Sequence, residues 1–190
     1  MRYPSDHKPR TRQRILDAAA RLFRRHGYRG VGIDRIMTSA DLTRGAFYAH
    51  FPSKEALFGA VVGQESDFVR RLRAAEDGRD VVRAYLDPAN REKIARGCTL
   101  ATLTQDVPRT GSAPRAAYAR LVARLAGALE AHVPADAPDR RGRALAAMAL
   151  AVGAIGLARG VGDEALAREI LAACSERACA ELGGGAPTPS

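Results

Sequence analysis

The architecture of this chain follows from residues 33–54, IDRIMTSADLTRGAFYAHFPSK, which read as two short helices joined by a tight turn. In the first helix Ile33, Ile36 and Met37 recur at i, i+3 and i+4, so one stripe of it can be buried. The turn that follows, Ala40-Asp41-Leu42, offers a small residue, a residue that tolerates left-handed backbone and an apolar plug. This spacing predicts a helix-turn-helix.

The second short helix, predicted over Thr43 to His50, provides the outward surface of this motif. Thr43 can cap its N-terminus, and Phe47 can point inward against Leu42. The outward residues supply hydrogen-bond donors for phosphates and base edges, as a helix lying in a DNA major groove requires. An ordinary helical hairpin with a solvated basic face is the alternative. The outward set is Thr43, Arg44, Gly45, Tyr48 and His50.

Two further basic residues are predicted near helix starts. Arg12, in a helix expected over Pro9 to His26, could reach the DNA backbone or the minor groove, although a free solvated arginine is equally compatible. Lys54 begins the helix after Ser53, where backbone N–H groups and an ammonium can both hold a phosphate. Arg12 and Lys54 complete the predicted DNA contacts.

Motifs around this stretch occur in a fixed order, and together they resemble the DNA-binding domain of the TetR family of bacterial transcriptional regulators over about residues 10–62. The resemblance implies that Tyr48 and Lys54 contact phosphates. One position departs from the family pattern, because Asp41 stands where a glycine is usual in the turn. The motifs are R-x-x-I-L-x-A-A-x-x-L-F (Arg12 to Phe23), H-G-Y (His26 to Tyr28), T-R-G-A-F-Y-A-H-F (Thr43 to Phe51) and S-K-E-A-L (Ser53 to Leu57).

Charge is concentrated on the same part of the chain. Of the net +9, residues 1–60 hold 12 Lys and Arg against 5 Asp and Glu, whereas residues 61–190 hold 18 against 16. Basic charge gathered around a helix-turn-helix is expected of a phosphate-binding surface. The partner predicted by this asymmetry is double-stranded DNA.

Composition argues against several other classes of protein. Three widely spaced cysteines without a C-x-x-C motif indicate neither a disulfide framework nor a zinc site. No secretion signal and no uncharged apolar run of ~20 residues is present, so we expect a cytoplasmic protein with no membrane partner. We also expect no catalytic residues, metal or cofactor, and a thiol-dependent helical enzyme using Cys98 and His132 is the alternative.

Helical patterns continue along 190 residues, 46% of which are apolar, so the predicted fold class is all-α with about nine helices. We expect an N-terminal three-helix helix-turn-helix domain over 1–62, a larger C-terminal helical domain for ligand binding and dimerisation over 63–182, and a disordered tail over 183–190. A long helix from about Lys54 to Glu76 is expected to link the domains.

The last two predicted helices suggest a homodimer. The helix from about Asp139 to Arg159 is apolar most of the way round, with Gly and Ala residues that allow close approach. Paired with the Ala-rich helix from Asp163 to Leu182, it fits a two-chain four-helix interface, and a core helix of a single chain is the alternative.

The C-terminal domain is the remaining place to bind a small-molecule effector. A mixture of apolar bodies and polar tips suits a pocket between helices, yet it equally suits a satisfied core. The residues predicted to line this pocket are Tyr85, Thr102, Leu103, Asp106, Tyr118, Val122 and Met148.

Cys98 is a second candidate for receiving a signal. It follows a cation and precedes a predicted helix, and both features favour the reactive thiolate. G-C with L-x-x-D (Leu103 to Asp106) and G-A-x-x-L-A-R (Gly153 to Arg159) downstream resembles a branch of the family in which some members sense electrophiles or oxidants through this cysteine. In that branch a cation matching Arg159 lies nearby. A packing cysteine that caps the helix is the alternative.

These observations predict a homodimeric transcriptional regulator, usually a repressor, that binds a palindromic operator and is released by a small molecule or by thiol modification. A transcriptional activator and a non-specific DNA-binding protein are the alternatives.

Overall fold

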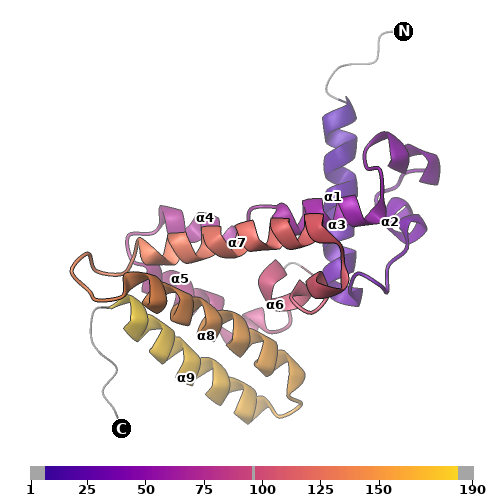
Figure 1. The fold of residues 1–190 in the computed structure, drawn as a ribbon. Helices are drawn as coiled ribbons and strands as arrows, with labels where there is room; N and C mark the ends of the chain where they lie inside the picture. The colour runs from indigo at the N-terminus through magenta and orange to yellow at the C-terminus, as the bar shows by residue number, and fades with distance from the viewer. Residues whose placement is uncertain (1–6, 96, 184–190) are drawn as a thin grey trace. The chain divides into compact units, whose positions relative to one another are not determined.

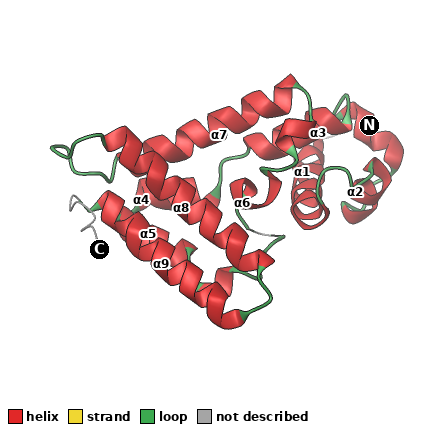
Figure 2. Cartoon of the chain, turned by 60° about the horizontal axis from the view of Figure 1, so that its bottom comes forward, coloured by secondary structure: helices red, strands yellow, loops and turns green. Residues whose placement is uncertain are grey.

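Helices account for the regular structure of residues 7–95 and 97–183, the part of the chain described by this computed structural model (Figure 1). These residues form nine α-helices and three 3-10 helices with no strand among them, which confirms the predicted all-α class (Figure 2). Of the tail expected over 183–190, all but Gly183 lies outside the described residues.

The helices divide into two compact units, each of which is described by itself. Unit 1 is Met1–Gln64 with Thr102–Arg120, and unit 2 is Glu65–Ala101 with Leu121–Ser190. Unit 1 thus combines the N-terminal part of the chain with a later segment, Thr102–Arg120. The contiguous domains expected over 1–62 and 63–182 were defined by function and stay a prediction.

Unit 1 begins with α1 (His7–His26), whose apolar stripe includes the fully buried Ile15 and Phe23. Gly27 ends this helix, with a φ of +70° and its N–H donating to the Phe23 carbonyl oxygen at 2.8 Å. The helix-turn-helix follows as α2 (Ile33–Ser39) and η1 (Arg44–Ala49), and then come α3 (Lys54–Gly63), η3 (Val107–Arg109) and the start of α7 (Ser112–Glu130).

The core of unit 1 is aromatic and draws on both of its segments. The Phe58 ring lies 5.3 Å from that of Phe23, edge to face, and 4.7 Å from that of Tyr28. Buried residues of the later segment join the same cluster, so the N-terminal helices alone do not complete it. These residues are Leu103, Val107 and Ala117.

The second short helix predicted over Thr43 to His50 is present as η1, and it is a 3-10 helix rather than an α-helix. The segment is a six-residue 3-10 helix, held by i to i+3 bonds such as Ala46 N–H to the Thr43 carbonyl and His50 N–H to the Phe47 carbonyl. Thr43 occupies the N-cap position, but its side chain makes no capping bond. So short a helix depends on tertiary packing rather than on its own backbone ladder.

The long helix predicted from Lys54 to Glu76 is also wrong. Helix α3 ends at Gly63, Gln64 turns to an extended ψ of 143°, and α4 (Asp67–Ala74) starts afresh. The Ser66 hydroxyl accepts from the Val69 N–H at 3.2 Å and so caps the start of α4.

Unit 2 contains α4, α5 (Gly78–Tyr85), η2 (Pro88–Asn90), the start of α6 (Thr99–Leu103) and the end of α7. Its last two helices, α8 (Arg140–Gly160) and α9 (Glu164–Leu182), form a hairpin whose members run side by side (Figures 1 and 2). Asp139, with a φ of +47°, caps α8, and Asp163 caps α9. By length and composition alone α8 could cross a membrane, but the interior helix of a bundle passes the same test.

His132, just after α7, fastens three helices of unit 2. Its Nδ1 accepts from the Gly78 N–H at 3.1 Å, so Nε2 carries the proton and donates to the Leu72 carbonyl oxygen at 2.8 Å. Both ring nitrogens of His132 are therefore bonded to backbone groups, one in α4 and one in α5.

Candidate nucleic-acid interface

The outward face of η1 carries the predicted DNA contacts of the helix-turn-helix. Phe47 is fully buried and anchors the segment, and its ring lies 5.2 Å from that of Tyr48, edge to face. Tyr48 is 59% exposed, so its side chain lies at the surface beside the buried Phe47. Thr43, Arg44 and Gly45 are exposed as well, and His50 is half-buried.

The turn before η1 is braced from α1. Asp41 has a φ of +53°, as predicted for a residue that replaces the usual glycine. The Arg14 guanidinium donates to the carbonyl oxygens of Ala40 at 2.7 Å and of Asp41 at 3.2 Å, and it lies 3.6 Å from the Asp41 carboxylate. Arg14, which sequence reasoning missed, thus holds the turn in place.

A basic hollow of about 580 Å³ lies between the start of α1 and the end of η1. The guanidinium of Arg12 rests 4.7 Å from the centre of the Phe51 ring, which orients it. Lys8 was not predicted, because the helix was expected to begin at Pro9, whereas α1 begins at His7. The hollow is lined by Lys8, Pro9, Arg12, Ala49 and His50.

Lys54 is partly buried and bonded within the unit. Its Nζ donates to the carbonyl oxygens of Tyr28 and Val31, both at 3.1 Å, and lies 4.2 Å from the centre of the Tyr28 ring. Burial lowers the pKa of this ammonium. An ammonium has three donors, so one N–H lies outside these two bonds, and a phosphate contact by Lys54 stays a prediction.

Two charged residues in the first turn of α2 reach in different directions. Asp34 accepts from Nη1 of Arg44 at 2.9 Å, which joins α2 to η1. Arg35 donates to Nε2 of His26 at 2.9 Å, which joins α2 to the end of α1. Desolvation, followed by the charges of Arg35 and Arg25, lowers the pKa of His26, consistent with a neutral, accepting ring.

Four of the residues predicted to line an effector pocket fall in unit 1. Asp106 accepts from the Tyr28 N–H at 3.1 Å and is thus bonded to the residue after the α1 stop. The hydroxyls of Thr104 and Tyr118 lie 2.9 Å apart, and Leu103 is fully buried in the unit 1 core. The four are Thr102, Leu103, Asp106 and Tyr118.

The other three predicted lining residues fall in unit 2, as do Cys98 and Arg159 of the thiol prediction, and Tyr85, Cys98 and Arg159 meet there. Burial raises the pKa of Tyr85, and the neighbouring Cys98 thiol raises it further. The Tyr85 ring stacks on the Phe68 ring, with the ring centres 4.3 Å apart. Arg159 donates to the carbonyl oxygens of Arg91 at 3.0 Å and Asn90 at 3.3 Å. Burial lowers its pKa, and its Nη1 is buried with no hydrogen-bond partner in the described part of the chain. Val122 and Met148 are half-buried.

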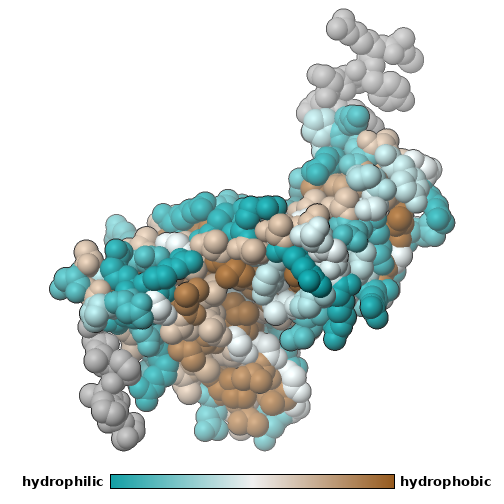
Figure 3. All heavy atoms as spheres, viewed as in Figure 1, coloured by the Kyte–Doolittle hydropathy of each residue, from teal (hydrophilic) through white to brown (hydrophobic). Residues whose placement is uncertain are grey.

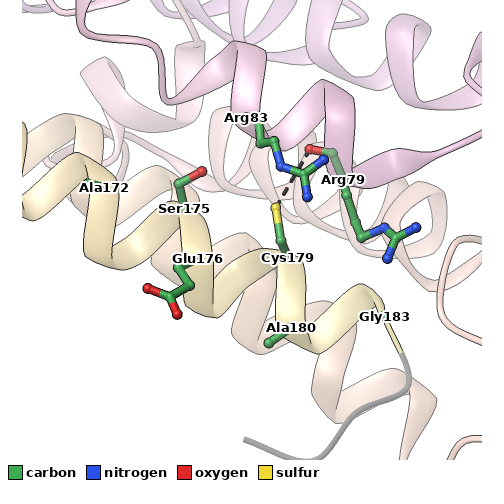
Figure 4. Close-up of a pocket in the computed structure, with 8 residues that line it drawn as sticks. All are labelled: Arg79, Arg83, Ala172, Ser175, Glu176, Cys179, Ala180 and Gly183. Carbon is green, nitrogen blue, oxygen red and sulfur yellow. Dashed lines mark hydrogen bonds between the residues drawn. The ribbon is translucent and has the colours of Figure 1, made fainter.

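A separate hollow of about 620 Å³ opens between α5 and α9 (Figure 4). Arg79 and Arg83 reach it from α5, and the Cys179 thiol on α9 donates to the Arg79 carbonyl oxygen at 3.7 Å. Burial raises the pKa of this thiol. No residue predicted to line an effector pocket lies among the residues around this hollow.

Comparisons with known proteins agree with the geometry of unit 1. Residues 15–61 match the model of the bacterial regulatory proteins of the tetR family. The chain is 36% identical over 80 residues to the HTH-type transcriptional regulator LmrA of Bacillus subtilis, and 31% identical over 86 residues to the HTH-type transcriptional repressor AcnR of Corynebacterium glutamicum. The match to LmrA covers 42% of this chain and 40% of LmrA, and the match to AcnR covers 45% of this chain and 46% of AcnR. This chain therefore matches less than half the length of either relative.

Solved structures extend the likeness to the whole fold. The reduced form of E. coli NemR is 25% identical with a TM-score of 0.68, over 95% of this chain and 99% of that one. A TetR family transcriptional regulator from Cytophaga hutchinsonii has a TM-score of 0.74 at 21% identity, over 90% and 94% of the two chains. The second likeness shows the fold alone.

Proposed function

We propose, on the premise that this chain belongs to the TetR family through its N-terminal domain, that it is a transcriptional regulator that binds double-stranded DNA and represses transcription. The observation that carries the proposal is the exposed face of η1, with Arg44 and Tyr48 presented over the buried Phe47. The adjacent hollow, with Lys8 and Arg12, adds cations beside that face.

The α8–α9 hairpin supports a homodimer. Only 33% of the most apolar stretch of α8 is buried, and apolar surface gathers over the hairpin (Figure 3). Leu145, Leu157 and Leu166 are 38%, 62% and 43% exposed. A side chain added at Gly153 or Gly156 would meet nothing within 4 Å, so a second helix has room to approach closely. Two η1 helices related by a twofold axis would read a palindromic operator.

We propose further that an effector bound in unit 2 releases the protein from DNA. A ligand releases DNA only to the extent that it binds the released conformation better than the DNA-bound one. The meeting of Tyr85, Cys98 and Arg159 supports unit 2 as the place where a small molecule or a thiol modification acts, because a buried guanidinium nitrogen there lacks a partner among the described residues. The packing alternative for Cys98 predicts no response.

The DNA-binding proposal is tested by replacing Arg44 and Tyr48 with alanine together. An operator is first selected from a random duplex library with the natural protein, and binding is then measured by fluorescence anisotropy at fixed salt. Loss of a base contact and a phosphate contact is expected to weaken operator binding about tenfold or more. Arg83→Ala, which removes one positive charge from α5, is the control and should bind almost normally. Unchanged binding by the double variant would contradict the proposal.

The thiol proposal is tested by Cys98→Ser. An electrophile such as N-ethylmaleimide should release the operator from the natural protein and from Cys174→Ser, but not from Cys98→Ser. A normal response of Cys98→Ser would show that the thiol is a packing residue.

A further inference from the structure

Asp34 is an acidic residue on the surface expected to face DNA. Its Oδ2 accepts from Nη1 of Arg44 at 2.9 Å, and the two side chains are 67% and 65% exposed. Residues 1–60 hold only 5 acidic residues against 12 basic ones, so a carboxylate beside η1 weakens the attraction for phosphate where the rest of the unit strengthens it.

The other acidic residue of the helix-turn-helix has a different role. Asp41 forms the left-handed turn, and its neighbour Arg14 is engaged chiefly with the carbonyl oxygens of Ala40 and Asp41. These bonds hold Arg14 to the turn. Arg44, in contrast, lies on the outward face of η1, so the partner of Asp34 is itself a predicted DNA contact.

An exposed ion pair of this kind is weak and can be exchanged for a better partner. A phosphate offers Arg44 another ion pair, but it brings a negative charge close to Asp34. The edge of a guanine offers two acceptors in the geometry of a guanidinium and carries no net charge, so it does not repel the carboxylate. Asp34 therefore weakens the capture of Arg44 by phosphate more than its pairing with a base.

We propose that Asp34 is a specificity-determining residue that restrains Arg44 from phosphate and so raises the ratio of operator binding to binding of arbitrary DNA. This inference rests on the proposed function. It gives the helix-turn-helix a selective penalty against wrong sequences in addition to its attraction for the right one.

The test compares Asp34→Asn with the natural protein on two duplexes, the selected operator and a mixed-sequence duplex, over a range of salt concentrations. Freeing Arg44 is expected to tighten mixed-sequence binding about two- to fivefold. The slope of log affinity against log salt should steepen by about one, as for one added phosphate contact. Operator affinity should change less, so the ratio of the two affinities falls.

Two controls separate this role from net charge. Asp17→Asn removes the same charge from α1, where Asp17 accepts from Gln13 one turn away at 2.8 Å, and should leave the ratio unchanged. In an Arg44→Ala background, Asp34→Asn should also leave the ratio unchanged. Circular dichroism melting checks that every variant is folded.

The inference is overturned if Asp17→Asn lowers the ratio as much as Asp34→Asn, because the effect would then be net charge alone. It is also overturned if Asp34→Asn keeps the ratio or weakens only operator binding, since the carboxylate would then orient Arg44 rather than restrain it. Failure of the natural protein to prefer any selected duplex would instead defeat the proposed function.

Discussion

The core of unit 1 and the α8–α9 hairpin of unit 2 handle apolar side chains in opposite ways. In unit 1 the rings of Phe23, Phe47 and Phe58 are all fully buried, whereas in the hairpin Leu157 is 62% exposed. Large rings that pack together fill the core of unit 1 within one chain. Small residues and outward-pointing leucines leave apolar surface exposed on the hairpin. Unit 1 therefore buries its large apolar side chains within the chain, whereas the hairpin leaves some of its leucines at the surface, where the proposed dimer would cover them.

The largest test of this contrast is Phe58→Ala in the finished core. Removing a buried ring that contacts Phe23 and Tyr28 should cost about 3–5 kcal/mol of unfolding free energy, measured by urea denaturation. The matched change in the hairpin is Leu157→Ala, whose effect should appear only through assembly and so depend on protein concentration. Equal, concentration-independent losses would remove the contrast.

A second test concerns assembly directly. Leu157→Glu places a charge in the open apolar surface and should convert a dimer into a monomer, as measured by sedimentation equilibrium. Ile94→Glu alters a residue that is 38% exposed in the loop before α6, and it should leave the dimer intact. If the natural protein is already monomeric, the hairpin is not a dimer interface.

A smaller test uses an aspartate with left-handed backbone in each region. Asp41→Gly relieves a backbone cost of about 1 kcal/mol, partly offset by greater freedom of the unfolded chain. Asp139→Gly relieves the same cost but loses the bond from the Gly142 N–H, 3.0 Å from its carboxylate. Calorimetry should therefore show a higher melting temperature for Asp41→Gly than for Asp139→Gly, and the reverse order would contradict this reading.

Local features of the fold could be predicted from the sequence because they depend on neighbouring residues. The stop at Gly27, the cap that Ser53 provides to Ala56 and the left-handed Asp41 all follow from the chemistry of a few adjacent positions. The break after Gly63 was missed because an apolar periodicity continues through it, although Ser66 was available as a capping signal.

The outward residues of the candidate site could be predicted from the sequence, but the contacts that hold them in place could not. The outward residues of η1 follow from its periodicity, and they are exposed or half-buried in the structure. Contacts between distant positions were not predictable, because no local pattern encodes them. Arg14 bonds to a turn 26 residues later, Lys54 to a carbonyl 26 residues earlier, and Asp34 to an arginine 10 residues later.

The later segment in the core of unit 1 has a consequence for anyone who would transplant this domain. A chimera that carries only residues 1–62 onto a foreign scaffold leaves behind Leu103, Val107 and Ala117, which belong to the same buried cluster. It also severs the bond from the Tyr28 N–H to Asp106. A graft that keeps this core intact therefore requires both pieces of chain, which a single cut cannot supply.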